Sequence, residues 1–327
     1  MSDFGTATLD LRGKADFRPL FQEPVPKLTE FWNRLIHHNA LCVYFFLMTA
    51  VIYGQTKIDI SGTVEWDRME INAAVSLDLA SANIRLPTGR TQGEELIGAE
   101  YIALIRPHIL SIPVDSSLTI EDYIEAGNFS LLRAEGLALS ARAVPPSLSP
   151  DFTKLKAQYT ISIAGISAEF IRHTRPAETR RVLIPAPTTS YTGIIIMAAE
   201  ELPVHGMKAL SLTLPCLFPK IWDTDMNLIY ERNMLEVQNP RSPMVRYAAA
   251  EGIFRPTPSG LSPELSALVG DKPLRIIARG VFGKRPTDPI IDREDALTII
   301  SSEENRRLLR EGKVVIVLND EVLQDEF

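Results

Sequence analysis

Two series of alternating apolar and polar residues constrain the fold of this chain more than any other feature of its sequence. They occupy residues 58–66 and 69–79, and the frame slips by one residue between them. A period of two is typical of a β-strand with one buried face. A two-residue turn at 67–68 explains the slip, because it pairs Val64 with Ile71 on the same face. The sequence therefore predicts a β-hairpin whose turn is flanked by apolar residues.

Three helices are predicted after this hairpin. The first begins near Gly89 and ends at Pro107, with apolar residues at helical spacing between them. Residues 119–122, Thr-Ile-Glu-Asp, fit a capping box at the start of the second helix. Gly127-Asn128 interrupts that helix before a third one, which we expect to run to about Ala141.

A proline- and serine-rich stretch at residues 143–152 is the best candidate for a linker. It divides the chain into three predicted regions. Residues 1–54 are an N-terminal tail with a signal peptide or membrane anchor, residues 55–146 an α+β domain of a hairpin plus helices, and residues 147–327 a strand-rich domain.

The chain beyond the linker reads mostly as strands between proline-rich loops, with one hairpin turn expected at Arg232-Asn233. Near the end, Asp292 and Ser301 are suitable N-caps for two helices, and Gly312 suits the position after a helix. We expect a β-α-α-β unit with its own small core from residue 274 to residue 318. The other expected strands lie at 157–165, 180–187, 192–199, 208–217, 226–232, 234–238 and 245–253.

The expected fold class is therefore α+β, with strand-rich mixed sheets and a few short helices, preceded by an apolar export or anchor helix. That helix is predicted from a run of fourteen residues, 40–53, which is apolar except for Thr49. A membrane-spanning helix needs roughly 20 such residues, whereas a run of about 10–14 is typical of a signal peptide or a buried helix. The run has no polar face, which argues against a core helix.

We therefore expect export, with residues 40–53 either cleaved or retained as a membrane tether. Residues 1–24 make an export signal unusually long, and a start near Val25 would give one of conventional length. The expected location is the periplasm or the outer envelope, or the inner membrane if the signal is not cleaved.

Charge and cysteine content exclude several classes of protein. The net charge is −7, and Lys and Arg do not cluster, so no nucleic-acid partner is expected. The two cysteines are Cys42 and Cys216, and Cys42 lies in the apolar run. Loss of that run would leave one thiol, which excludes an intramolecular disulfide and a paired-cysteine metal site.

The sequence carries no established catalytic signature, and we assign no catalytic, cofactor-binding or metal-binding residue. No G-x-G-x-x-G, H-E-x-x-H or G-x-S-x-G pattern is present. Asp223, Asp225 and Asn227 resemble the opening of a calcium loop, but Leu228 stands where that loop requires Gly. A polar turn between strands explains these residues more simply.

The densest charged cluster contains Asp288, Asp292 and Asp295, close in sequence to several basic residues. Paired carboxylates can perform acid–base chemistry. Helix caps and solvated turns explain the same residues more simply, so catalysis by this cluster is the alternative and not the leading hypothesis.

Two stretches resemble known proteins. Residues 86–117 (LPTGRTQGEELIGAEYIALIRPHILSIPVDSS) and residues 275–320 are similar to an uncharacterised family of exported spirochaete proteins. More distantly, the hairpin followed by GRTQGEELIGAEYIAL resembles LPP20-type envelope domains, which occur in outer-membrane lipoproteins and flagellar accessory proteins. This chain lacks their lipid-modified cysteine. The resemblance implies a role in the envelope and transfers no catalytic residue.

The leading hypothesis is an exported structural or interaction module of the bacterial cell envelope, with flagellar association as one option. Its expected partners are other envelope or flagellar proteins. The alternatives are an envelope hydrolase that uses carboxylates near Asp288 and Asp292, and a membrane-tethered ligand-binding protein. No cofactor is implied by any of these hypotheses.

Overall fold

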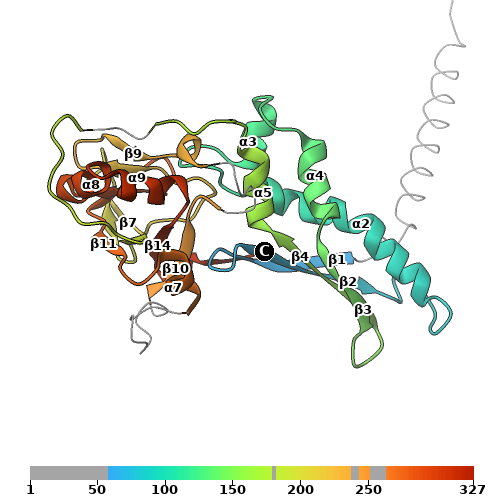
Figure 1. Cartoon of the computed structure of the whole chain (residues 1–327). Helices are drawn as coiled ribbons and strands as arrows, with labels where there is room; N and C mark the ends of the chain where they lie inside the picture. Colours follow the sequence, from blue (N-terminus) through green and yellow to red (C-terminus); the bar gives the residue numbers. More distant parts are fainter. Residues whose placement is uncertain (1–57, 179–181, 237–242, 251–262) are drawn as a thin grey trace, which may run out of the picture. The chain divides into compact units, whose positions relative to one another are not determined.

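The computed structural model describes residues 58–178, 182–236, 243–250 and 263–327 (Figure 1). The N-terminal tail and the apolar run 40–53 lie outside the described residues, so export and the anchor helix remain predictions. No helix within the described ranges is long and apolar enough to cross a membrane.

The fold is α+β, as predicted. Its first part is an antiparallel sheet with the strand order β15-β1-β2-β4-β3. Helices α2 (Arg90–Leu110), α3 (Ile120–Glu125), α4 (Leu131–Leu139) and α5 (Ile163–Phe170) belong to the same part, and α2, α4 and α5 lie on one face of the sheet (Figure 1). The strands are β1 (Ile58–Glu65), β2 (Glu70–Asp78), β3 (Arg142–Leu148), β4 (Lys154–Ser162) and β15 (Gln324–Glu326).

The predicted hairpin is confirmed, including its register. Val64 lies opposite Ile71 in the β1–β2 pair. The Met69 amide donates to the Trp66 carbonyl oxygen at 3.3 Å across the two-residue turn. Alternate residues of β2 are buried, as the alternating pattern requires. Side-chain period and turn length together fix the register.

The first predicted helix is α2, but it does not end at Pro107. Pro107 lies inside the helix, which continues to Leu110. Proline lacks an N–H group and therefore removes one helical hydrogen bond. The last turn persists because Ile109 is buried, as the last member of a stripe at four-residue spacing that also contains Gly93, Ile97, Tyr101 and Ile105.

The second and third predicted helices are also confirmed, as α3 and α4. Thr119 accepts from the Asp122 amide, and Asp122 accepts from the Thr119 amide, which is the predicted capping box.

The linker predicted at residues 143–152 is wrong. Residues Arg142–Leu148 form the edge strand β3, which pairs with β4, and the rest of the stretch is the turn between these two strands. The predicted division at 146/147 thus falls inside one strand. Prolines are tolerated here because an edge strand has one side without sheet partners, where a missing N–H costs no ladder bond.

The second part contains a four-stranded parallel sheet with the order β10-β14-β5-β11. Helices α8 (Arg293–Ile300) and α9 (Glu303–Arg310) pack their apolar residues against one face of this sheet. Helix α7 (Pro263–Val269) packs against the other face. The strands are β5 (Ile194–Met197), β10 (Arg246–Ala249), β11 (Leu274–Ile277) and β14 (Val314–Leu318).

A second four-stranded sheet and a two-stranded ribbon complete this part. The sheet has the order β12-β13-β8-β9, and the ribbon pairs β6 with β7. Their strands are β12 (Gly280–Phe282), β13 (Asp288–Ile291), β8 (Ile221–Asp223), β9 (Leu228–Tyr230), β6 (Leu202–Pro203) and β7 (Leu210–Ser211).

The expected β-α-α-β unit at 274–318 contains the predicted elements, but it does not form its own sheet. β11 and β14 do not pair with each other, because β5 lies between them. β14 is buried at all five positions, as predicted. Gly312 has φ +65° directly after α9, also as predicted.

Two cap predictions need correction. Asp292 occupies the N-cap position of α8 but makes no side-chain capping bond there. Ser302, not Ser301, caps α9 by accepting from the Asn305 amide. Ser301 instead accepts from the Ala186 amide, so its hydroxyl fixes the segment that joins the two parts.

Some predicted strands are absent from the described residues. Residues 182–187 form no strand, and Arg232–Met234 form the 3₁₀ helix η1 in place of the expected hairpin turn. β9 pairs with β8 instead. The chain ends with the 3₁₀ helix η2 (Asp320–Val322) and then β15, which returns from the second part to pair with β1.

Candidate functional site

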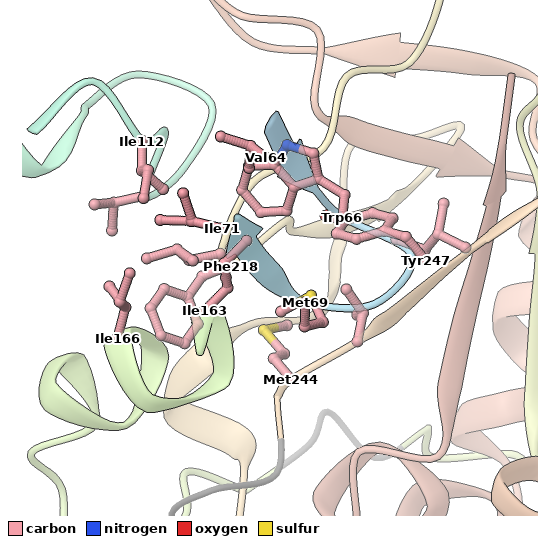
Figure 2. Close-up of a cluster of buried hydrophobic side chains, with 14 of the residues drawn as sticks. Val64, Trp66, Met69, Ile71, Ile112, Ile163, Ile166, Phe218, Met244 and Tyr247 are labelled. Carbon is pink, nitrogen blue, oxygen red and sulfur yellow. The ribbon is translucent and has the colours of Figure 1, made fainter. Parts of the chain in front are cut away.

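The turn of the β1–β2 hairpin is buried against the second part of the chain. Figure 2 shows Trp66 and Met69 gathered with Met244 and Tyr247 in one apolar cluster. The rings of Trp66 and Tyr247 meet edge to face, with their centroids 5.9 Å apart. The Trp66 amide also donates to the Leu323 carbonyl oxygen at 2.9 Å. This end of the five-stranded sheet is therefore a structural junction.

A buried carboxylate lies in the second part, next to a loop from the first. Asp288 is fully buried, and its Oδ1 accepts from the Lys220 amide and from the Thr287 hydroxyl, each at 3.0 Å. The Ser116 hydroxyl of the first part also donates to it. Burial is the main cause that raises the pKa of Asp288, and these hydrogen bonds oppose the rise.

Backbone hydrogen bonds surround this carboxylate and join the same two parts. The Leu217 amide donates to the Pro113 carbonyl oxygen at 3.0 Å, and the Arg285 amide donates to the Ser116 carbonyl oxygen at 2.9 Å. Asp288 therefore accepts hydrogen bonds at a buried contact between the two parts. Because its side chain has no exposed surface, a substrate has no access to it in this structure.

The nearby thiol is equally inaccessible. Cys216 is fully buried, and burial raises the pKa of its thiol. The Tyr247 hydroxyl donates to the Cys216 carbonyl oxygen at 2.8 Å and accepts from the Cys216 amide at 3.0 Å. A thiol in such surroundings stays protonated and is a poor nucleophile.

Asp292 has a different environment from Asp288. Its Oδ2 accepts from Arg279 Nε at 2.6 Å in a partly exposed ion pair. Asp295, three residues later on α8, has its pKa raised by burial first and by the charge of Asp292 second. The structure thus separates a buried structural carboxylate from a surface ion pair, and it does not bring Asp288 and Asp292 together as an acid–base pair.

The polar loop after β8 is a turn that uses its own donors. Asp223 Oδ1 accepts from the Asp225 amide at 3.0 Å and from the Asn227 amide at 2.7 Å. Its Oδ2 accepts from Asn227 Nδ2 at 2.8 Å. Within the described ranges, no three His, Cys, Asp or Glu side chains gather as a metal-binding group.

The concavity between α2 and α4 is small. It has no room for even a water molecule, and it is bordered by the ion pair between Arg106 and Glu135, whose nitrogen and oxygen lie 2.6 Å apart. Ligand pockets for small molecules usually occupy roughly 300–1,000 Å³. The concavity has no room for a small-molecule ligand.

Helix α4 exposes large apolar side chains and buries small ones. It buries Ala134 and Ala138, each 2% exposed, and presents Leu132 and Leu139 to solvent at 77% and 70%. Leu132, Gly136 and Leu139 share one face at i, i+4 and i+7. We call this face, with its three residues, the α4 outer face. A helix usually buries its larger apolar residues, so the arrangement is inverted here.

Sequence reasoning missed the α4 outer face, although a signal was present. The segment Leu-Leu-Arg-Ala-Glu-Gly-Leu-Ala-Leu has large apolar residues around most of its circumference. The sequence could not show which of these residues the rest of the protein covers.

The edge of the five-stranded sheet is, by contrast, protected. Pro145 and Pro146 lie in the edge strand β3, and the register of its pairing with β4 shifts between Val144 and Ser147. Proline and irregular pairing both hinder the addition of a further strand. This edge is a poor docking surface for an extended peptide.

Comparisons with known proteins match both parts of the chain. Residues 57–169 match the family model described as Treponema pallidum Tp0624, N-terminal domain. Residues 193–320 match the model described as Treponema pallidum Tp0624, second domain. The two matches follow one another along the chain in the order that their descriptions give. No curated protein matched the chain.

Proposed function

We propose that this chain, with its two Tp0624-type domains, is an exported interaction module of the bacterial cell envelope. The α4 outer face is its docking surface for another envelope protein. The exposure of Leu132 and Leu139 beside buried alanines is the observation that carries this proposal. The apolar run 40–53 and the resemblance to LPP20-type envelope domains support the envelope location.

The surface chemistry favours a protein partner. Interface centres are depleted in charge and rich in apolar side chains, whereas rims are polar. Around the α4 outer face the neighbouring charges are already paired, since Arg133 contacts Glu169 at 3.3 Å and Arg106 contacts Glu135 at 2.6 Å. An apolar centre with such a rim suits an apolar helix or groove of a partner.

The geometry favours this proposal over the two alternatives. A hydrolase would need a carboxylate that water and substrate can reach. Asp288 is buried, its Oδ1 accepts two hydrogen bonds, and its Oδ2 lies 3.5 Å from Trp222 Nε1. Among the described residues, the concavity between α2 and α4 in particular is too small to support the ligand-binding alternative. The proposal needs only the exposed side chains that the structure presents.

Photocrosslinking in intact cells tests the docking surface. A photoreactive amino acid at position 132 should form a discrete adduct with an envelope protein, and Leu139→Ser in the same chain should abolish it. The matched control is position 210, where Leu210 is exposed to a similar degree on β7. Adducts of equal yield at both positions, or none at position 132, would contradict the proposal.

Export is tested separately. A fusion of residues 1–70 to a reporter that is active only outside the cytoplasm should be active, because the segment includes the apolar run. An inactive fusion retained in the cytoplasm would contradict export, whatever the crosslinking shows.

A further inference from the structure

Phe152 combines two unfavourable properties in one exposed position. It lies in the turn between β3 and β4, its side chain is 67% exposed, and its φ is +56°. Left-handed backbone is costly for bulky residues and is adopted readily by Gly and Asn. Asn83 has φ +54°, as suits its type, and Met69 has φ +55° in a buried site. Phe152 has neither a suitable type nor a buried environment.

The turn holds Phe152 in place through Asp151. The Asp151 carboxylate accepts from the Ser149 hydroxyl at 2.5 Å and from the Thr153 hydroxyl at 2.7 Å. The Phe152 amide donates to the Ser149 carbonyl oxygen at 2.9 Å. The aromatic ring is thus displayed by a rigid turn, and strain maintained by surrounding bonds is a frequent sign of function.

The turn lies at the end of the sheet where the N-terminal segment joins it. The row of strand partners there runs from Ile58 to Leu77, from Leu77 to Leu155, and from Leu155 to Leu148. The chain of β3 leaves this row at Leu148 and reaches Phe152 within the turn. Phe152 therefore projects from the same end of the sheet at which β1 begins.

Only a short connection separates this end from the apolar run. Residues 54–57 lie between Tyr53 and Ile58. Five residue steps can span at most about 17 Å. If residues 40–53 stay in a membrane, this end of the sheet is held close to the bilayer surface, where an aromatic side chain meets the interfacial layer at high effective concentration.

We propose that Phe152 inserts into the interfacial layer of the lipid bilayer that holds residues 40–53. This contact holds the β3–β4 turn against the membrane and leaves α4, on the helix-covered face of the sheet, available to a partner. The inference rests on the proposed export and on retention of residues 40–53 as a membrane tether, the second of the two forms expected from the sequence.

Quenching of an introduced tryptophan by brominated lipid tests the contact. The full chain, as the variant Phe152→Trp, is reconstituted into phosphatidylcholine vesicles with and without bromine on the acyl chains near the headgroups. Its emission is compared with that of the wild type, which has three tryptophans of its own. The matched control is Val144→Trp, at an exposed position farther along the same strand β3.

The brominated vesicles should remove most of the emission that Trp at position 152 adds, and little of that added at position 144, because only interfacial aromatics reach the lipid. Equal quenching at the two positions, or none at position 152, would overturn the inference. Failure of the chain to float with vesicles would overturn it too, because the tether would then be absent. That result would leave the crosslinking at position 132 as an independent test of the docking surface.

Discussion

Two turns at opposite ends of the same sheet place a large apolar residue in the left-handed conformation, with opposite surroundings. Met69, after the β1–β2 turn, has φ +55° and is 2% exposed. Phe152, in the β3–β4 turn, has φ +56° and is 67% exposed. The backbone requirement is the same in both turns. What covers the side chain is different.

The second part of the chain covers the first turn. Met69 packs with Trp66, Met244 and Tyr247 (Figure 2), and its carbonyl oxygen accepts from the Ile163 amide at 2.8 Å. Burial of an apolar side chain contributes roughly 1.5–3 kcal/mol, which offsets the cost of the left-handed backbone. No such compensation acts on Phe152 within the described residues. The first turn therefore adds to the stability of the fold, whereas the second leaves Phe152 free for the membrane contact proposed above.

The largest change in stability is expected when the buried aromatic ring of Trp66 is removed. Trp66→Ala should lower the free energy of unfolding by about 3–5 kcal/mol, because Trp66 is 4% exposed and leaves a cavity at the junction. Urea denaturation measures the change. Phe152→Ala in the opposite turn is the control and should shift the free energy by less than about 0.5 kcal/mol. Similar losses in both variants would remove the distinction between the turns.

A second test concerns Asp288, whose buried carboxylate accepts hydrogen bonds from both parts of the chain. Asp288→Asn should cost about 2 kcal/mol at neutral pH, because an NH₂ group cannot accept where a carboxylate oxygen does. Either the Trp222 indole N–H or the Lys220 amide and the Thr287 hydroxyl then lose their acceptor. Burial raises the folded-state pKa of Asp288 above its ordinary value of 3.8. The folded wild type therefore takes up a proton at a higher pH than the unfolded chain.

The sign of the pH effect follows from that shift. As pH falls from neutral through the folded-state pKa, the wild type gains stability relative to Asp288→Asn, and the gain is complete below 3.8. Denaturation midpoints recorded at several pH values should show the two proteins moving apart towards acid. Curves that converge towards acid would show that the carboxylate is stabilised in its charged form.

A third test measures how much the left-handed backbone at Phe152 lowers the free energy of unfolding. Phe152→Asn should raise the free energy of unfolding by about 0.5–1 kcal/mol, since Asn adopts the left-handed conformation more readily. Phe152→Leu keeps the backbone penalty and should leave stability unchanged. A loss of stability in Phe152→Asn would mean that the ring packs on the protein, and the contrast with Met69 would disappear.

The smallest effect is expected away from both turns. Asp292→Asn should cost less than about 1 kcal/mol, because it weakens an ion pair with Arg279 whose partners are 37% and 56% exposed. High salt should reduce the difference from the wild type further. Normal folding together with complete loss of cellular function in this variant would favour the hydrolase hypothesis and contradict the structural role.

Local signals account for what could be predicted of the fold. The frame slip before Met69 fixed the hairpin, and Thr119 with Asp122 fixed the start of α3, because both depend on neighbours within a few residues. The 3₁₀ helix at Arg232–Met234 was missed, and so was the helical conformation of Ile163–Phe170. A short apolar segment such as Ile163–Phe170 satisfies strand and helix patterns equally, and tertiary contacts decide between them.

The candidate site was predicted less well than the fold. Asp288 and Asp292 are close in sequence, yet one is buried in a joint and the other is on the surface. The α4 outer face could not be predicted either, because Leu132 and Ala134 are both ordinary helix residues. Exposure depends on which neighbours pack on a helix, and those neighbours lie far away in sequence.

The hairpin register, the capped helix α3 and the buried strand Val314–Leu318 follow from local sequence patterns, since side-chain period and local hydrogen bonds act over a few residues. Long-range packing, by contrast, makes Arg142–Leu148 an edge strand and not a linker, and it places β5 between β11 and β14. It also decided that Met69 is covered while Phe152 is not. These outcomes depend on contacts between residues distant in the chain, which local patterns do not encode.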